Sequence, residues 1–402
     1  MAWNQLRQWS GIACHNTTGA VLAVDLPNSS GRQPLGGEIR ASLAKLKSLK
    51  HLDLSGNNFT GKIPHFLSSL ENLQYLNLSY AGFSGAIPPN LGNLSSLQFL
   101  DVSYWGLTVD NLEWVSGLLS LKYLAMNSVD LSKLGGEWIE PLNKLPLLSE
   151  LHLEYCGLSG FSYSLPSLNF TSLKVLNLQG SLFKAKLPTW LANISSLVSV
   201  DIGNSWLTGR IPLGFGELPN LQSLKLNYNL KLSASCFQLF ARSWKKIQIL
   251  DLSINGLHGV ISEAHFHRLG KLEKISLSEN SFVLNVSSIW VPPFQVIALE
   301  MGSCHLDPLT VKCSNDSNNG GDNYPDGGGK ADQTDNGNGF IDKWFYMSIG
   351  VGFAAGLLLP YLVFAMKRSW GGVYFAFVDG TAYRLSSEKM KAAARRRNRG
   401  AR

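Results

Sequence analysis

Leucine residues recur along most of the chain at a nearly constant interval, and the polar positions between them repeat as well. The segment 46–69, "LKSLKHLDLSGNNFTGKIPHFLSS", is followed by units of the same pattern at steps of 24 to 27 residues. Within a unit, the alternation of Leu76 and Leu78 with polar neighbours predicts a short strand. One unit cannot bury its own leucines, so we expect the units to stack as coils of a solenoid. The eleven units begin at Leu46, Leu70, Leu94, Leu118, Leu145, Phe170, Ile194, Leu218, Trp244, Leu269 and Pro293.

The order of positions inside each unit identifies the kind of repeat. The pattern L-x-x-L-x-L-x-x-N-x-L at this period is typical of leucine-rich repeats. We therefore expect an α/β solenoid, a right-handed horseshoe with short parallel strands on its concave face. The Asn position should lie inside the bend, where a side-chain amide can bond backbone groups that are otherwise buried unpaired. It is occupied by Asn57, Asn229, Asn255 and Asn280, and in other units by Ala81, Cys156, Ser181, Ser205 and Cys304.

Aromatic residues occupy two columns on the expected concave face. One column consists of Tyr75, Phe99 and Tyr123, and the other, just before the Asn position, consists of Tyr80, Tyr104, Tyr155 and Tyr228. Because neighbouring strands lie about 4.8 Å apart, each column predicts a near-continuous aromatic strip. Such a strip either anchors a ligand or packs the coils against one another, and the sequence leaves both interpretations open. A third column is interpreted as structural and consists of Asp53, Asp101, Asp201 and Asp251.

One segment near the C-terminus predicts a membrane span. Residues 344–366 are 23 positions without a charged side chain, and roughly 20 are enough to cross a bilayer. The tail, 367–402, holds ten Lys or Arg residues against two acidic ones, whereas the rest of the chain is close to neutral. This positive charge predicts a cytoplasmic tail and an extracellular N-terminal part, as in a single-pass type I protein of the plasma membrane. The basic balance therefore does not indicate a nucleic-acid-binding domain.

Sequons for N-glycosylation support the same orientation. All nine Asn-x-Ser/Thr sequences precede the expected span, and they begin at Asn16, Asn28, Asn58, Asn77, Asn93, Asn169, Asn193, Asn285 and Asn315. The first fourteen residues, "MAWNQLRQWSGIAC", contain no apolar run of signal-peptide length. From this we expect either a different start of the chain or an abnormal product.

The segment "WFYMSIGVGFAAGLLLPYLVFAMKRSW" (344–370) is similar to the membrane segment of plant receptor-like proteins of the fungal-xylanase (EIX) receptor type, and other motifs agree. The segments "GKIP" (61–64), "GAIP" (85–88) and "GRIP" (209–212) resemble the plant-specific class of leucine-rich repeat. Similarly, "WSGIAC" (9–14) and "DPLTVKCSND" (307–316) look like the ends of the two caps of such solenoids. The resemblance implies a remnant N-terminal cap with a partial repeat (1–45), about eleven repeats (46–306), a remnant C-terminal cap with a polar stalk (307–343), the span (344–366) and the tail (367–402).

Departures from the family pattern imply a shortened protein. Members of the family carry a signal peptide, a paired-cysteine N-terminal cap and many more repeats. Cys14 lacks the partner that the family would supply. Cys313 also lacks its partner unless it forms a disulfide with Cys304, and such a bond would pull Cys304 out of its coil. No role is assigned to Cys236. We interpret the chain as a truncated paralogue or as a gene model that skips coding sequence.

The resemblance also implies partners for the membrane segment and the tail. Family members recognise an extracellular ligand, lack a kinase of their own and signal through a partner receptor kinase. Gly352 and Gly356, with Ser348 one turn earlier, predict a face on which another membrane helix can approach closely, although glycine is frequent in such helices. Tyr374 and Phe377 fit the form of an endocytosis signal, or alternatively belong to an interfacial aromatic belt.

Neither a metal site nor a catalytic centre is predicted. His258, His265 and His267 fall within ten residues, but no Cys or carboxylate stands at a confirming ligand spacing, so we interpret them as repeat residues. No nucleophile, acid and base can be assembled, and no cofactor is expected. The leading hypothesis is a cell-surface defence receptor for a peptide, protein or glycan. The alternatives are an inhibitor of secreted cell-wall-degrading enzymes, a non-functional fragment and a developmental peptide co-receptor.

Overall fold

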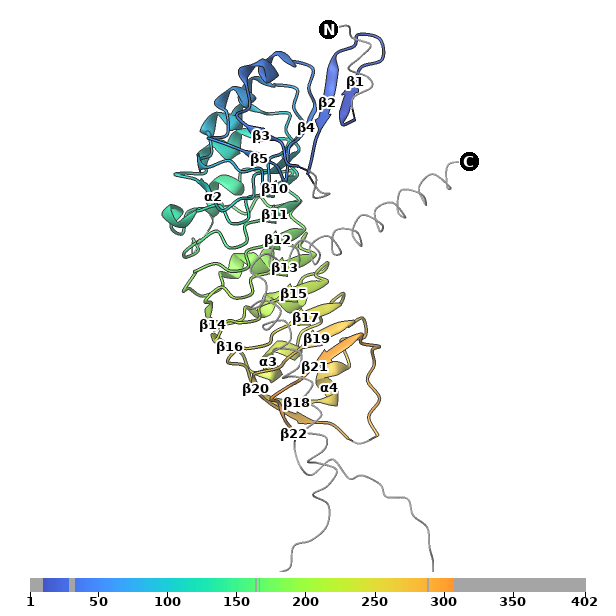
Figure 1. Cartoon of the computed structure of the whole chain (residues 1–402). Helices are drawn as coiled ribbons and strands as arrows, with labels where there is room; N and C mark the ends of the chain where they lie inside the picture. The colour runs from blue at the N-terminus through green and yellow to red at the C-terminus, as the bar shows by residue number, and fades with distance from the viewer. Residues whose placement is uncertain (1–9, 29–32, 163–164, 166, 288, 307–402) are drawn as a thin grey trace, which may run out of the picture. The chain divides into compact units, whose positions relative to one another are not determined.

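The computed structural model describes residues 10–306, apart from 29–32, 163–164, 166 and 288. In this part of the chain, a thirteen-stranded sheet runs through successive coils in chain order, parallel except for the antiparallel pair β1 and β2 (Figure 1). Each of the eleven expected units contributes one strand. The strands are β1 (Ile12–Cys14), β2 (Val21–Asp25), β4 (His51–Asp53), β6 (Tyr75–Asn77), β8 (Phe99–Asp101), β10 (Tyr123–Ala125), β11 (Glu150–His152), β12 (Val175–Asn177), β13 (Ser199–Asp201), β15 (Ser223–Lys225), β17 (Ile249–Asp251), β19 (Lys274–Ser276) and β21 (Ala298–Glu300).

The alternation of side chains sets the two faces of this sheet. In β6 the middle residue, Leu76, is fully buried, while Tyr75 and Asn77 on either side of it are half-buried on the opposite face. Leu76 is in register with Leu52 of β4 and Leu100 of β8, so the leucines form a continuous core through the coils. We call the opposite surface, formed by the first and third residues of the strands, the sheet face. It is the surface expected as concave.

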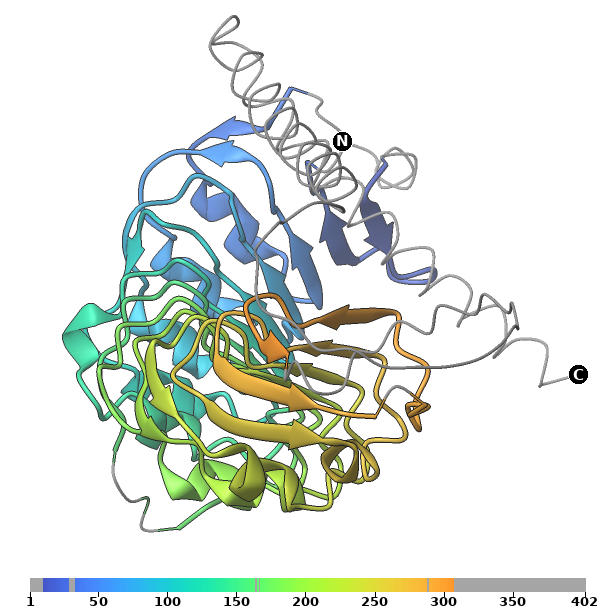
Figure 2. The same cartoon turned by 90° about the horizontal axis from the view of Figure 1, so that it is seen from below.

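Short strands and single helical turns complete most coils on the other side (Figures 1 and 2). The additional strands are β3 (Gly36–Gly37), β5 (Asn58–Phe59), β7 (Gly85–Ala86), β9 (Leu107–Thr108), β14 (Thr208–Arg210), β16 (Lys231–Ser233), β18 (His258–Ser262), β20 (Ser281–Asn285) and β22 (His305–Leu306). The 3₁₀ turns are η1 (Ala41–Lys45), η2 (His65–Ser69), η3 (Pro89–Asn93), η4 (Glu113–Gly117), η5 (Ser132–Leu134), η6 (Thr189–Asn193) and η7 (Leu213–Glu217). The α-helical turns are α2 (Ile139–Leu142), α3 (Cys236–Phe240) and α4 (Glu263–Phe266).

Buried asparagines hold the bend after the strands, as the repeat pattern predicts. The Asn229 side chain is fully buried, and its Nδ2 donates to the carbonyls of Ile202 at 3.0 Å and Leu226 at 2.9 Å. Its Oδ1 accepts the backbone N–H groups of Ser205 at 3.0 Å and Leu207 at 2.9 Å. One amide therefore satisfies backbone groups of two neighbouring coils. Cys156 fills the same position with a buried thiol that donates to the carbonyl of Met126.

Among the described residues, no helix has the length and apolar character needed to cross a membrane. The expected span, 344–366, lies outside the described part of the chain, and so do Ser348, Gly352, Gly356, Tyr374 and Phe377. The same holds for the expected C-terminal cap and stalk, for Cys313 and for the sequon at Asn315.

Candidate ligand-binding face

Five aromatic rings stack in one continuous row on the sheet face. Their order is His51, Tyr75, Phe99, Tyr123 and His152. The centroid distances along the row are 4.1, 4.2, 4.3 and 5.1 Å. The first three contacts are face to face, with interplanar angles of 15°, 9° and 8°. We call this row the aromatic stack.

The register of the strands produces the stack. Tyr75, Phe99 and Tyr123 are the first residues of consecutive strands and are directly paired, with His51 of β4 preceding them. The spacing of adjacent strands, about 4.8 Å, is close to the distance between stacked rings. His152 occupies a different strand position from the other four rings, because it is the third residue of β11 and pairs with Ala125. Its ring lies at 35° to that of Tyr123.

All five rings are half-buried, so the stack packs the coils laterally and also borders solvent. Burial raises the pKa of Tyr75 to about 12, with a further contribution from the nearby negative charge of Asp53. Burial also raises the pKa of Tyr123, again assisted by a carboxylate, Asp101. Both phenols are therefore neutral donors at any physiological pH. The Tyr75 hydroxyl donates to Asp53 Oδ2 at 3.3 Å.

A polar column lies beside the stack, on the third residues of the three-residue strands and on Asp25, the last residue of β2, which is in register with Asp53. It begins with Asp25, Asp53, Asn77 and Asp101 in β2, β4, β6 and β8. Asp53 Oδ1 accepts the backbone N–H of Ser55 at 2.9 Å and its hydroxyl at 2.6 Å. The same contact to the N–H two residues later occurs at Asp101, Asp201 and Asp251. The structural interpretation of this aspartate column is thus confirmed for one oxygen of each carboxylate.

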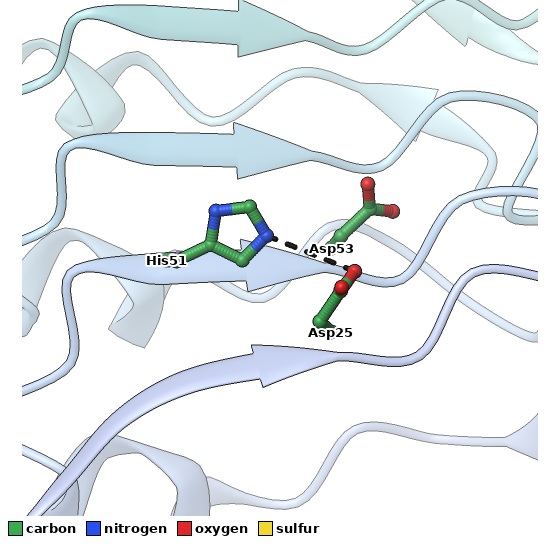
Figure 3. A group of neighbouring side chains, drawn as sticks. All are labelled: Asp25, His51 and Asp53. Atoms are coloured by element: carbon green, nitrogen blue, oxygen red, sulfur yellow. Dashed lines mark ion pairs between the residues drawn. The ribbon is translucent and has the colours of Figure 1, made fainter. Parts of the chain in front are cut away.

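At the N-terminal end of the stack, Asp25, His51 and Asp53 converge (Figure 3). One donor atom from each lies within 4.8 Å of the others, and His51 Nε2 is 3.8 Å from Asp25 Oδ1. The sequence pattern predicts no metal site at His258, His265 and His267, and it does not single out this group. Asp53 is 7% exposed, and both of its oxygens already accept protein donors, which makes the group a poor fit to a metal that requires free carboxylate lone pairs.

The other end of the stack carries a second set of charged groups. His152 Nε2 lies 3.4 Å from Glu150 Oε2, and this hydrogen bond lowers the pKa of Glu150. Glu154 accepts from Asn177 Nδ2 at 2.7 Å, while burial raises its pKa. Both ends of the stack therefore combine an imidazole with carboxylates.

The second expected aromatic column is interrupted. Tyr80 and Tyr104 make an edge contact with centroids 6.4 Å apart, and Tyr104 also lies 5.3 Å from Trp105. Tyr155 and Tyr228 belong to the coils of β11 and β15, with the coils of β12 and β13 between them. The near-continuous strip predicted for this column is therefore wrong, because intervening coils carry other residues, such as Gly180, at the same position.

Large exposed side chains nevertheless lie along the turns that follow the strands of the sheet, and we call this surface the flank of the solenoid. The backbone takes a left-handed conformation at Tyr80, Tyr155 and Tyr228, and each of these side chains is more than half exposed. Other exposed residues were not part of the predicted column, because they stand one or two positions after the tyrosine position in their coils. They are Trp105, Leu182, Trp206 and Leu230.

The sequons fall into two structural groups. Asn77 lies in β6 on the sheet face, and its Oδ1 accepts the Ser79 N–H at 3.0 Å and hydroxyl at 2.7 Å. Asn28 is half-buried. The remaining described sequon asparagines are exposed, and they are Asn16, Asn58, Asn93, Asn169, Asn193 and Asn285.

The three C-terminal histidines do not converge on one point. His258 begins β18 and is exposed, as is His267. The His265 ring accepts the backbone N–H of Ser262 through Nδ1 at 2.9 Å, and its Nε2 is 3.6 Å from the Cys236 thiol. Burial raises the pKa of that thiol to about 11, which keeps it protonated.

Comparisons with known proteins agree with this architecture. Residues 33–232 match the family model described as a leucine-rich repeat region. Receptor-like protein EIX1 of Solanum lycopersicum is 36% identical over 315 residues, which are 68% of this chain and 30% of that protein. Receptor-like protein EIX2 of the same species is 37% identical, over 70% of this chain and 29% of its own length. The chain thus spans about a third of the length of these relatives.

Solved structures give the same result. One is the leucine-rich repeat ectodomain of the plant membrane receptor kinase GASSHO1/SCHENGEN3 from Arabidopsis thaliana, in complex with CASPARIAN STRIP INTEGRITY FACTOR 2. It is 28% identical with a TM-score of 0.62, over 75% of this chain and 38% of that one. Another is the plant peptide hormone receptor RGFR1 in complex with RGF2, which is 25% identical with a TM-score of 0.57, over 68% of this chain and 46% of that one.

The fold and the repeated sheet face define a leucine-rich repeat protein. Among these proteins, the chain belongs to the plant receptor-like proteins, the family of the EIX relatives.

Proposed function

We propose that the described solenoid is the extracellular ligand-recognition part of a plant cell-surface receptor and that the aromatic stack is part of its binding face. The observation that carries this proposal is the row of five rings from His51 to His152, bordered by carboxylates. Stacked rings are held rigid before a ligand arrives, so little side-chain entropy is lost on binding. Aromatic residues are also the commonest anchors at protein interfaces.

A peptide or a protein segment is the ligand class that we favour. The two similar ectodomains were solved with CASPARIAN STRIP INTEGRITY FACTOR 2 and with RGF2, and the second is named as a peptide hormone receptor. The stack extends over five consecutive coils, which at about 4.8 Å per strand is nearly 20 Å. An extended peptide of about six residues covers that distance at 3.3 Å per residue.

The remaining features complete the proposal for the whole protein. The segment 344–366 would anchor the receptor in the plasma membrane, and Ser348, Gly352 and Gly356 would contact a partner receptor kinase that signals in plant defence. Tyr374 and Phe377 would direct endocytosis. The exposed sequon asparagines would carry glycans on the outer side of the membrane.

Selection from a peptide library tests the binding face. The full chain, expressed in plant cells behind a secretory leader, is used to select binders from random dodecapeptides displayed on phage. We expect enriched peptides with micromolar or better affinity. The double variant Tyr75→Ala and Phe99→Ala removes two of the three inner rings of the stack. It should therefore lower the affinity of a synthetic enriched peptide at least tenfold.

The matched control is Phe237→Ala, which removes a ring of α3 that is 74% exposed. This variant should bind the same peptide as well as the unmodified chain. Circular dichroism and melting curves identify a stack variant that fails to fold. The proposed binding face is wrong if a folded double variant retains full affinity, or if repeated selections enrich no peptide.

A further inference from the structure

The acidic residues of the polar column differ in their partners along the solenoid. In the later coils, Asp201 Oδ2 lies 3.3 Å from Lys225 Nζ, and Glu300 lies 3.6 Å from Lys274. Beside the aromatic stack, by contrast, no Lys or Arg lies within ion-pair distance of Asp25 or Asp101 in the described part of the chain.

The sequence of the first strands explains this difference. Ala23 and Asp25 of β2 lie in register with His51 and Asp53, and neither these positions nor the first and third residues of β4, β6, β8 and β10 include a Lys or Arg. Basic residues stand one position earlier, as Lys50 and Lys122, and Lys122 Nζ donates to Gln98 Oε1 at 3.0 Å. The stack is therefore bordered by negative charge on the side of the polar column.

Asp25 and Asp101 each present carboxylate oxygens that the fold does not use. In the described part of the chain, Ser103 bonds the Asp101 carboxylate through its side chain and through its backbone N–H, which donates to Oδ1 at 2.9 Å. Burial raises the pKa of Asp101, although the Ser103 hydrogen bonds and the charge of His152 act in the opposite direction, and no Lys or Arg of the described chain pairs with this carboxylate. Asp25 is more open, with its side chain 57% exposed, and points toward His51 in Figure 3.

The two carboxylates are spaced in a way that suits an extended chain. Asp25 and Asp101 are separated by three strand steps, or about 14 Å, and Asp53 and Asp101 by two steps, or about 10 Å. A peptide that runs across the strands rises about 3.3 Å per residue, so these distances equal three or four residues. Half-buried ring edges lie alongside and can cover the methylene stems of Lys or Arg.

We propose that this face selects peptides that carry two basic residues three or four positions apart. One cationic group binds at Asp25, next to Asp53, and the other binds at Asp101. The intervening residues cross the Tyr75 and Phe99 edges. This inference rests on the proposed function, because it names the chemistry of the ligand that the stack would bind.

The test uses the peptide selection described above, with two additional readouts. We expect most enriched sequences to contain Lys or Arg pairs separated by three or four positions. For a synthetic enriched peptide, the double variant Asp25→Ala and Asp101→Ala should lose at least tenfold in affinity, because each charge-assisted contact is removed. Alanine is used because asparagine at position 101 would complete the glycosylation sequon Asn-Val-Ser.

Asp251→Ala is the matched control. Asp251 belongs to the same column and makes the same contact to Ser253, but it is in register with Lys225 and lies far from the stack. Its replacement should leave the affinity unchanged. Replacing both basic residues of the peptide by glutamine should remove the difference between the unmodified chain and the double variant.

The outcomes separate the two proposals. Enrichment of peptides without the basic pair, which still lose affinity in the Tyr75→Ala and Phe99→Ala variant, overturns the inference and leaves the proposed function in place. If no peptide is enriched, both are wrong. Binding that disappears with EDTA would show that a bound metal ion, and not the carboxylates alone, holds the peptide, and this also overturns the inference.

Discussion

At the level of single residues, the repeat pattern predicted the buried asparagines because their role depends on the backbone, which every coil shares. It did not predict that His51 and His152 complete the aromatic stack. His152 is a third-position residue whose ring reaches Tyr123 beside the small side chain of Ala125. Such a contact between two columns depends on the size and orientation of the side chains. A comparison of the same position in successive repeats does not show it.

Removal of one buried asparagine should have a large effect on stability. Asn229→Ala leaves the N–H groups of Ser205 and Leu207 without their acceptor, and at least two carbonyls lose their donor. Each buried unsatisfied group costs about 1–3 kcal/mol. We therefore expect a loss of at least about 2 kcal/mol in the free energy of unfolding, measured by urea titration followed by circular dichroism.

The control for this variant is Asn72→Ala. Asn72 is exposed and donates one hydrogen bond to the carbonyl of Lys47, so its replacement should change stability by less than about 0.5 kcal/mol. Equal effects of the two substitutions would contradict the role assigned to the buried amide.

At the level of elements, the strands followed from the repeat pattern, but the close packing of the turns behind them did not. A Cβ atom at Gly92 in η3 would lie 2.3 Å from the carbonyl oxygen of Trp114 in η4. Similarly, a Cβ atom at Gly117 would lie 2.4 Å from the carbonyl oxygen of Gly92. The sequence shows these glycines, but not that their absent side chains allow neighbouring turns to touch.

Gly92→Ala should therefore force η3 and η4 apart. The obstacle is backbone and not a flexible side chain, so we expect a cost of about 1–3 kcal/mol, as for other overpacked sites. Gly270→Ala is the control, because its nearest atom, the carbonyl oxygen of Pro293, would be 3.8 Å away. The contact is wrongly assigned if both variants unfold at the same urea concentration.

At the level of the whole molecule, the sequence and the structure agree on a leucine-rich repeat solenoid. In the structure, the candidate ligand-binding residues lie on two different surfaces. The aromatic stack lies on the sheet face, whereas the exposed apolar residues from Trp105 to Leu230 follow the flank. The sequons are not equivalent either, because Asn77 is engaged within the sheet face while Asn93 and Asn193 are exposed at the ends of 3₁₀ turns. The sequence predicted columns of residues, and only their three-dimensional register separated the stack from the flank.

The most direct test of the account is to locate a bound peptide by photo-crosslinking. The photoreactive residue p-benzoylphenylalanine is placed in the full chain either at position 99, within the stack, or at position 237, on α3. We predict that an enriched peptide crosslinks to the chain modified at position 99 and not to the chain modified at position 237. Crosslinking at position 237, with none at position 99 in a folded protein that still binds the peptide, would contradict the assignment of the sheet face as the binding surface.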